Sequence, residues 1–184
     1  SVVVTDSGLV ELILPPNIRF QRGMRSIHPA SQGCMGYALP AAVGAYFSSN
    51  QPVVVVTGDG SIMMNLQELE TIRYHKLPIK VIVINNNAYA VIRKRQVDMF
   101  RRRTIGTDPT NGVSCPDFKK VADAFDLPHV LISSTTDLQV KLEEVLAMNG
   151  PVLCEIMSPE DQDYITISHA RTLENGFIRR LIED

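Results

Sequence analysis

Short runs of β-branched residues alternate along the chain with segments in which apolar residues recur at helical spacing. The runs at 53–56 and 79–84 are bounded by Gly, Asn and Pro, which is typical of buried strands in a parallel sheet. A helical pattern at 62–72 joins them and completes a predicted βαβ unit. The predicted strands are 2–4, 18–21, 53–56, 79–84, 129–133 and 152–157, and the predicted helices are 9–14, 33–47, 62–72, 117–125 and 136–148. This alternation predicts an α/β fold, with a parallel sheet as the middle of three layers and helices on both faces.

Local signals set the expected ends of two helices. Asp6 or Ser7 is expected to cap the first helix, and the pair Pro15-Pro16 is expected to end it. Thr136 and Gln139 fit a capping box at the start of the last helix.

Two further segments are distinguished by their composition. Residues 93–103 carry six Lys or Arg side chains, and two interpretations stay open: a segment that binds an anion such as a substrate carboxylate, or a solvated helix or subunit contact. Residues 104–115 are rich in Gly, Asp, Pro, Thr and Asn. They predict a mobile loop that could close over an active site shared with another domain.

Polar clusters follow the two strands of the predicted βαβ unit. Gly58-Asp59-Gly60-Ser61 comes after the first strand and Asn85-Asn86-Asn87 after the second, so both lie where open α/β sheets bind ligands. Each cluster alone is typical of a turn or loop, but together they offer a carboxylate, a carboxamide oxygen and backbone carbonyls. This all-oxygen set suits Mg²⁺, with Ca²⁺ as the second choice. Ser61 and the amides after it can open a helix N-terminus, which is a natural place for a phosphate.

The spacing of these clusters resembles the thiamine diphosphate motif. Gly58-Asp59-Gly60 is followed, 86 − 59 = 27 residues after the Asp, by the second Asn of an Asn-Asn pair. The flanking segments resemble those of acetolactate synthases and related 2-oxo acid enzymes: Gly33-Cys34-Met35-Gly36-Tyr37-Ala38-Leu39-Pro40-Ala41-Ala42, Met64-Asn65-Leu66-Gln67-Glu68-Leu69, Leu77-Pro78 and Pro116-Asp117-Phe118. The similarity extends from about Val2 to about Met157 and covers the C-terminal, diphosphate-binding domain of such an enzyme.

The resemblance implies thiamine diphosphate and Mg²⁺ as cofactors. It implies Asp59, Asn86 and the carbonyl of Ala88 as metal ligands, a carbonyl at Gly33 that meets the aminopyrimidine, and a Met35 side chain between the two cofactor rings. The cofactor-binding residues implied are Gly8, Gly33, Met35, Gly58, Asp59, Gly60, Ser61, Asn86, Ala88 and Tyr89.

The chain departs from the family pattern at two places. Leu9-Val10 replaces a Gln-His pair that helps hold the diphosphate in acetolactate synthases, which leaves only backbone contacts near Gly8. Ala90 replaces a Gly and restricts the backbone there.

The function implied is the metal–diphosphate half of an acetolactate synthase-like enzyme, which decarboxylates a 2-oxo acid such as pyruvate and joins the product to a second 2-oxo acid. In the family the activating Glu belongs to a pyrimidine-binding domain, normally on a second subunit. No catalytic residue is therefore assigned here, the isolated domain is expected to be inactive or nearly so, and a homo-oligomer is expected. FAD is possible in the full-length enzyme. The alternatives are part of a phosphono- or sulfopyruvate-type decarboxylase and a non-catalytic regulatory domain.

Composition sets the remaining expectations. The 184 residues are 45% hydrophobic and 21% charged, which predicts one soluble globular domain. A net charge of −2 gives no reason to expect nucleic acid or a membrane as partner. Three Cys without metal-like spacing suggest reduced thiols and a cytoplasmic protein.

The expected domain covers residues 1–158, and residues 159–184 form an arm that packs on the domain or on a partner. The arm is expected to be exposed because it carries Glu160, Asp161 and Asp163. A short helix is predicted at residues 177–182. The sequence has no initiator Met, and two origins stay open: a piece of a longer protein, or a natural separate subunit.

Overall fold

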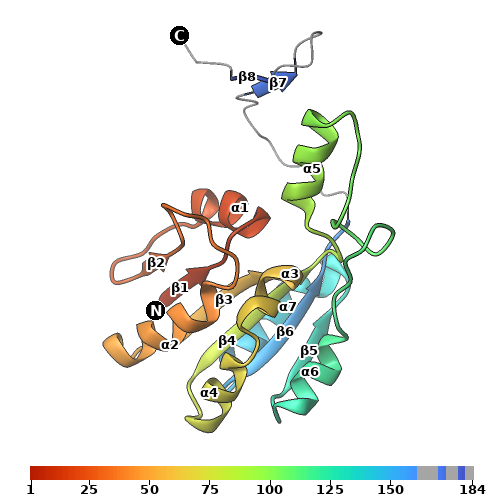
Figure 1. Cartoon of the computed structure of the whole chain (residues 1–184). Coiled ribbons are helices and arrows are strands. Elements are labelled where there is room, and N and C mark those ends of the chain that lie inside the picture. Colours follow the sequence, from red (N-terminus) through yellow and green to blue (C-terminus); the bar gives the residue numbers. More distant parts are fainter. Residues whose placement is uncertain (161–169, 173–177, 181–184) are drawn as a thin grey trace.

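The computed structural model contains a six-stranded parallel sheet (Figure 1), and the structure describes residues 1–160, 170–172 and 178–180. The strands pair in the order β2-β1-β3-β4-β6-β5, and each neighbouring pair is parallel. Their bounds are β1 Val2–Thr5, β2 Arg25–Ile27, β3 Val53–Gly58, β4 Ile79–Asn85, β5 His129–Ile132 and β6 Val152–Met157. The predicted parallel α/β sheet is confirmed.

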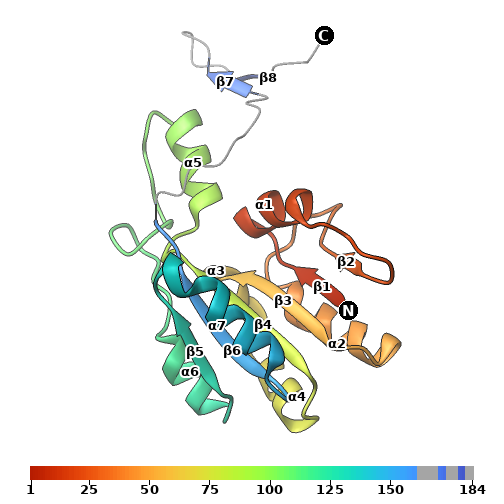
Figure 2. The ribbon, with the colours of Figure 1, turned by 180° about the vertical axis from the view of Figure 1, so that it is seen from behind.

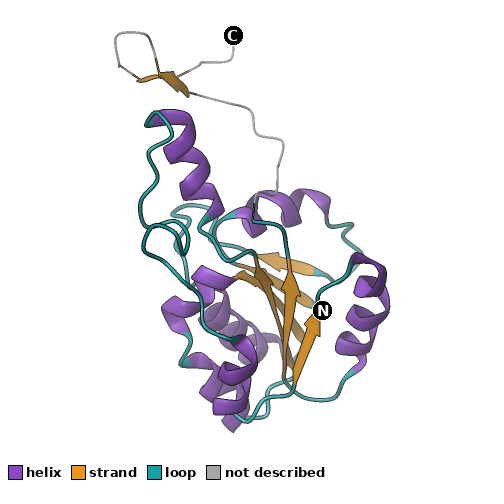
Figure 3. Ribbon diagram, turned by 90° about the vertical axis from the view of Figure 1, so that its right-hand side faces the viewer, coloured by secondary structure: helices purple, strands orange, loops and turns teal. Residues whose placement is uncertain are grey.

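Helices cover both faces of this sheet, as Figures 1 and 2 show from opposite sides. The helical elements are α1 Leu9–Asn17, α2 Ala38–Ser49, α3 Asp59–Ile62, the 3₁₀ turn η1 Met63–Asn65, α4 Glu68–Tyr74, α5 Ala90–Met99, α6 Phe118–Ala124 and α7 Thr135–Ala147. Side chains of α2, α4 and α6 pack on one face in a large apolar core, and α7 packs on the other face in a smaller one. The side view in Figure 3 shows the sheet between these layers.

The two central strands are buried to different extents. In β4 six of the seven residues are buried, as expected for a strand covered on both faces. In β3 buried and half-buried residues alternate, so Val53 and Val55 enter the large core while Val54 and Val56 keep partial exposure. The prediction of buried strands therefore holds for β4, while β3 alternates between buried and half-buried residues.

The first helix does not end at its prolines. α1 continues through Pro15 and Pro16 to Asn17, and the prolines remove the two backbone bonds that would reach the carbonyls of Glu11 and Leu12. After the prolines, the Ile18 N–H donates to the Leu14 carbonyl at 3.1 Å.

Three other boundaries also differ from the prediction. Residues 18–21 form no strand, and the short edge strand β2 lies instead within residues 22–32, where the sequence indicates a loop. The helix predicted from Gly33 begins only at Ala38, since Gly33 and Gly36 have φ angles of 57° and 80°, outside the helical region. The third is at residues 62–72, which are divided among α3, η1 and α4.

Both predicted helix caps are wrong. The N-cap of α7 is Ser134, whose hydroxyl accepts the Thr136 N–H at 3.2 Å, while Gln139 donates to Glu143 instead of closing a capping box. Gly8 occupies the N-cap position of α1, with no side-chain bond to that helix end.

Few of the described residues belong to the predicted arm. Glu160 is exposed, as expected, whereas Asp161 and Asp163 lie outside the described residues. The predicted helix at 177–182 is wrong for Ile178–Arg180, which form strand β8 and pair with β7 (Ala170–Thr172), and its remaining residues are not described. The division between domain and arm stays a prediction.

Candidate functional site

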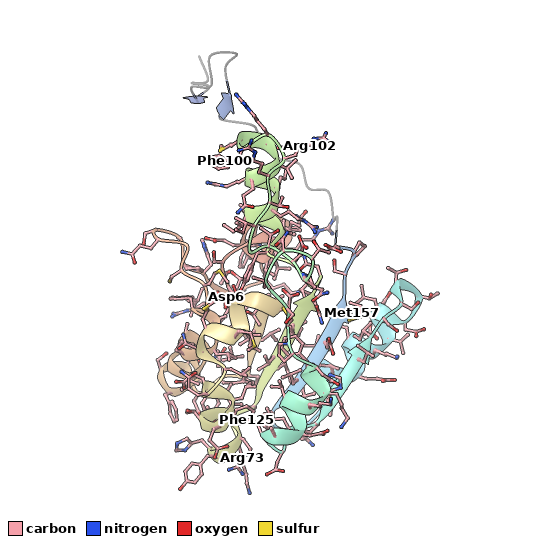
Figure 4. The ribbon with its side chains drawn as sticks, turned by 45° about the vertical axis from the view of Figure 1, so that its right-hand side comes forward. Asp6, Arg73, Phe100, Arg102, Phe125 and Met157 are labelled. Carbon is pink, nitrogen blue, oxygen red and sulfur yellow. The ribbon has the colours of Figure 1, made fainter. Side chains whose placement is uncertain are left out.

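The strand order creates a topological switch point between β1 and β3. From β1 the chain proceeds outward to β2, and it then returns to β3 on the other side of β1. In sheets of this kind ligands bind at the carboxyl ends of the strands beside the switch point, because the following segments leave in opposite directions there. In Figure 4 Asp6 and Met157 mark the carboxyl ends of the strands, while Arg73 and Phe125, at the ends of α4 and α6, lie at the opposite end of the domain.

A pocket of about 570 Å³ opens at this edge. It is lined by the segments after β1, β3 and β4, by α1, by the first turns of α5 and by Ser158 after β6. The residues implied by the sequence line it with one exception: Gly8, Met35, Gly58, Asp59, Gly60, Ser61, Asn86, Ala88 and Tyr89. The exception is Gly33, which is exposed and lies outside the lining.

Asp59 is a buried acidic residue in the lining of this pocket. Its side chain follows β3 directly and is only 3% exposed. Oδ1 accepts the Gly60 N–H at 2.8 Å, but Oδ2 is buried without a hydrogen-bond partner among the described residues. Burial raises the pKa of Asp59, and the Gly60 N–H, followed by the Asn87 N–H, the Cys115 thiol and the Ala88 N–H, offsets part of that rise. A buried carboxylate oxygen without a partner is unfavourable unless a cation completes it.

The second cluster brings further oxygens to the same pocket. Asn86 and Ala88 are buried, and the Ala88 N–H donates to Asn86 Oδ1 at 3.3 Å. No group of three or more His, Cys, Asp or Glu able to hold a metal occurs in the described part of the chain. One carboxylate, one carboxamide and one carbonyl are instead a donor set for a hard cation that keeps phosphate oxygens as further ligands. These residues therefore fit Mg²⁺ bound to a diphosphate.

Comparison with known proteins identifies the family. Residues 6–156 match the family described as "Thiamine pyrophosphate enzyme, C-terminal TPP binding domain". The chain belongs to this family.

Similar proteins include acetolactate synthase subunits from several organisms. The acetolactate synthase large subunit of Porphyra purpurea is 36% identical over 138 residues, which cover 74% of this chain and 23% of the relative. The isozyme 2 large subunit of Escherichia coli K12 is 34% identical over 160 residues, 86% of this chain and 29% of the relative. The probable chloroplastic acetolactate synthase 2 of rice is 30% identical over 191 residues, 100% of this chain and 28% of the relative. The chain thus spans about a quarter of the length of these relatives, and this thiamine diphosphate-binding domain corresponds to their C-terminal family domain.

Gly60 has a steric requirement in this thiamine diphosphate-binding domain. A Cβ added at Gly60 would lie 1.9 Å from Cε1 of Tyr89, so the Tyr89 ring packs directly on the glycine. The resulting contact joins the segment after β3 to the segment after β4. Burial, followed by electrostatic interactions with Cys115 and Asp59, raises the pKa of Tyr89.

The loop at 104–115 supports the same segment. The Tyr89 N–H donates to the Thr107 carbonyl at 2.8 Å. Cys115 lies beside Asp59, and burial followed by the charge of Asp59 raises the pKa of its thiol to about 12. All three cysteines are unpaired, as expected. The sequence showed neither contact, because nothing in its spacing links these loops.

Asp108 organises that loop. Its carboxylate accepts hydrogen bonds from Thr107 Oγ1 at 2.9 Å, Thr110 Oγ1 at 2.5 Å and Asn111 Nδ2 at 2.9 Å, and it lies 3.6 Å from Arg93. These bonds, led by that of Thr110, lower the pKa of Asp108 to about 2. The predicted irregular segment is confirmed and has a defined internal network, while its closure over a site stays a prediction.

This network predicts an acid-dependent stability. Since the folded-state pKa of Asp108 is lowered from 3.8 to about 2, its stabilising contribution is present above pH 3.8 and is lost as the pH falls through about 2. The variant Asp108→Asn should therefore melt below the wild type at pH 7, and the gap should narrow between pH 4 and pH 2. Thermal melts across this range check the expectation, with Asp137→Asn at an exposed ion pair as control. A gap that is constant with pH would contradict it.

Asp6 is a buried residue whose role the sequence assigned wrongly. Its carboxylate does not cap α1, and it accepts hydrogen bonds from the N–H groups of Tyr37 and Ala38 at 3.3 and 3.4 Å and from Thr57 Oγ1 at 3.0 Å. The bonds connect the end of β1, the start of α2 and the end of β3. Asp6 therefore holds together the strand ends that flank the switch point.

Different residues of the basic segment 93–103 fit the two interpretations, anion binding and a solvated helix. The helix α5 begins before it, at Ala90, and extends away from the sheet (Figure 1), and Figure 4 marks Phe100 and Arg102 beyond its far end. Arg93 pairs with Asp108 and Glu160, and Lys94 pairs with Asp98 on the same helix. Arg95 instead lines the pocket together with Val91 and Ile92.

Proposed function

We propose that this chain is the Mg²⁺–diphosphate half of an acetolactate synthase-like enzyme, which decarboxylates a 2-oxo acid such as pyruvate and joins the product to a second 2-oxo acid. The observation that carries the proposal is the buried, unpartnered Oδ2 of Asp59 in a pocket that Asn86 and Ala88 also line. The names of the similar proteins support acetolactate synthase chemistry over the phosphono- or sulfopyruvate decarboxylase alternative. The intact donor set argues against a regulatory domain without cofactor.

In this proposal each group of residues has a separate task. Asp59, Asn86 and the Ala88 carbonyl hold the ion, and the amides after Gly60 bind the diphosphate at the start of α3. Met35 supports the cofactor between its rings. Leu9, Val10 and other apolar side chains form much of the remaining wall and exclude water.

Bound thiamine diphosphate supplies the nucleophilic carbon and the electron sink for decarboxylation. The proton transfer that activates it needs an acidic residue, and no described side chain of this chain is assigned that task. We propose that a pyrimidine-binding domain of the same or a second subunit provides a Glu. The matched segments cover only 23% and 29% of two of the similar proteins, so the rest of their length leaves room for such a domain, for an FAD site and for homo-oligomer contacts. A cytoplasmic location stays a prediction, and no helix among the described residues is long and apolar enough to cross a membrane.

The proposal is tested with the full-length protein and with this chain alone. Titration calorimetry should show saturable binding of thiamine diphosphate that requires Mg²⁺. The full-length protein should convert pyruvate to acetolactate, whereas the chain alone should be inactive until the pyrimidine-binding domain is added. Absence of Mg²⁺-dependent binding, or absence of activity with every common 2-oxo acid, would remove the proposal.

Arg95 is the residue that we expect to bind the substrate carboxylate. It extends from α5 into the pocket wall, it is exposed, and it forms no ion pair within residues 1–160. In the variant Arg95→Gln the loss of one charge-assisted bond should raise KM for the 2-oxo acid about tenfold. The affinity for thiamine diphosphate should not change, and Arg103→Gln, outside the pocket lining, is the control. A weaker affinity for thiamine diphosphate with an unchanged KM would assign Arg95 to the diphosphate instead.

A further inference from the structure

Glu155 is a buried acid to which the proposed site assigns no task. It lies in β6 and is 8% exposed. Its Oε1 accepts a hydrogen bond from Asn85 Nδ2 at 2.7 Å, and its Oε2 lies 3.3 Å from His129 Nε2. The three residues come from β6, β4 and β5, which are neighbours in the sheet (Figure 2).

The strand register explains why these side chains meet. Glu155 is aligned with Val83 on β4 and with Leu131 on β5. Residues two positions apart in a strand project to the same face, so Asn85 and His129 share the face of Glu155. The contact therefore follows from the register of the sheet, and Asn85 is the last residue of β4 before the metal-binding segment.

The carboxylate determines which way the Asn85 amide points. A carboxylate only accepts hydrogen bonds, so the NH₂ end of Asn85 must face Glu155 and the oxygen end must face away from it. That oxygen, Oδ1, accepts the Asn87 N–H at 3.0 Å. Asn87 has a φ of 55°, a left-handed conformation that turns the chain between Asn86 and Ala88.

A contribution to stability does not by itself explain this arrangement. A buried carboxylate loses solvation, and apolar replacements of buried charged groups are often neutral or stabilising. Its bonds do, however, orient the segment that carries two of the three proposed metal ligands. Partners that orient a ligand usually affect metal affinity strongly.

We propose that Glu155 is a positioning residue, which acts through Asn85 to fix the shape of the segment 86–88 and thereby sets the affinity for the divalent ion. This inference rests on the proposed function of the pocket. It does not require Glu155 to touch the ion or the cofactor.

The first test removes the carboxylate in the full-length protein. In Glu155→Leu the Asn85 amide loses its fixed orientation, so the affinity for thiamine diphosphate with Mg²⁺ should fall about 10- to 100-fold in calorimetry. In the cofactor-free protein, amide hydrogen exchange at Asn87 should become about tenfold faster, while exchange at Ile82 in the middle of β4 should not change.

The matched control is Lys80→Met on the same strand. Lys80 is buried near the opposite end of β4, where its ammonium group donates to the carbonyls of Met148 and Gly150 after α7. This variant removes a buried charge and its bonds without touching the metal-binding segment. It should leave the affinity for thiamine diphosphate unchanged.

A reciprocal exchange separates positioning from a general structural role. Asn85→Asp alone places two carboxylates against each other. Glu155→Gln alone no longer forces the NH₂ end of the Asn85 amide to face residue 155. The double variant Asn85→Asp with Glu155→Gln restores one donor facing one carboxylate, and the carboxylate introduced at position 85 can still accept the Asn87 N–H. Its affinity for thiamine diphosphate with Mg²⁺ should be at least about tenfold higher than that of Asn85→Asp.

The outcomes are separable. If the wild-type protein does not bind thiamine diphosphate with Mg²⁺, the proposed function fails and this inference fails with it. If the wild type binds and Glu155→Leu binds equally well, only the inference is overturned. A double variant no better than Asn85→Asp, or unchanged exchange at Asn87, likewise overturns it.

Discussion

Replacing Asp59 with Asn should abolish Mg²⁺-dependent binding of thiamine diphosphate and at the same time raise the melting temperature of the cofactor-free protein. The loss follows from removing the only charged member of the proposed donor set, and it should reach about 100-fold or more, since even indirect partners of a metal ligand contribute roughly 10- to 100-fold. Calorimetry with Mg²⁺ and thiamine diphosphate measures it.

The gain in stability follows from the pKa of Asp59. Burial raises this pKa above its ordinary value of 3.8, so above that pH the acid group destabilises the folded, metal-free protein. For an acid whose folded-state pKa is raised, the destabilisation is present above the unfolded-state pKa. It fades as the pH falls and the group is protonated. The Asn variant lacks this destabilisation at every pH.

Asp98→Asn is the matched control for this experiment. Asp98 lies on α5 with an exposed side chain and pairs with Lys94, so the same chemical change occurs outside the pocket lining. Neither the affinity nor the melting temperature should change appreciably. A wild-type affinity in Asp59→Asn would remove Asp59 from the metal site, and a lower melting temperature would contradict the electrostatic argument.

Replacing Asp6 with Ala should destabilise the whole domain. Asp6 is 1% exposed, and the change would leave the Tyr37 N–H, the Ala38 N–H and the Thr57 hydroxyl without their acceptor. Buried donors left without partners cost about 1–3 kcal/mol each, and partial relaxation makes a total of about 3 kcal/mol reasonable. For a chain of this size that corresponds to a melting temperature lower by roughly 10 °C.

Asp123→Ala is the control for Asp6. Its carboxylate pairs with Lys119 on the exposed side of α6, with both side chains 59% exposed, so its removal should change stability by less than about 0.5 kcal/mol. Urea unfolding of both variants measures the difference. An Asp6 variant as stable as the Asp123 variant would show that the bonds at the switch point contribute nothing net.

The parts of the fold that could be predicted are those encoded by local pattern. The runs at β1, β3, β4, β5 and β6 were recognisable because parallel strands buried in a sheet are nearly continuous apolar segments. The edge strand β2 was missed because it contains Arg25 and Ser26 and is stabilised by pairing with β1 along one side only. The helix through Pro15 and Pro16 was missed because a local rule on proline does not weigh the packing of α1 on β1 and β3.

The candidate site was predictable to a similar degree. Asp59 and Asn86 could be placed at one pocket because each lies within a few residues of the end of a predicted strand, and the ends of adjacent parallel strands must come together. Gly33 was placed in the site by resemblance only, and it lies outside the lining of the pocket in this single chain. The supporting residues Asp6, Thr107 and Glu155 were not found, because each acts through a contact with a segment distant in the sequence.

The sequence by itself determined the α/β class and the two strand ends that carry an acid and an amide, since strand length, apolar content and turn residues are properties of short segments. Only the tertiary structure decided how those ends are held. The order β2-β1-β3-β4-β6-β5 created the switch point, and the register of β4 with β6 and β5 brought Glu155 to Asn85 and His129. Register and strand order depend on pairing between distant segments, and no single segment contains that information.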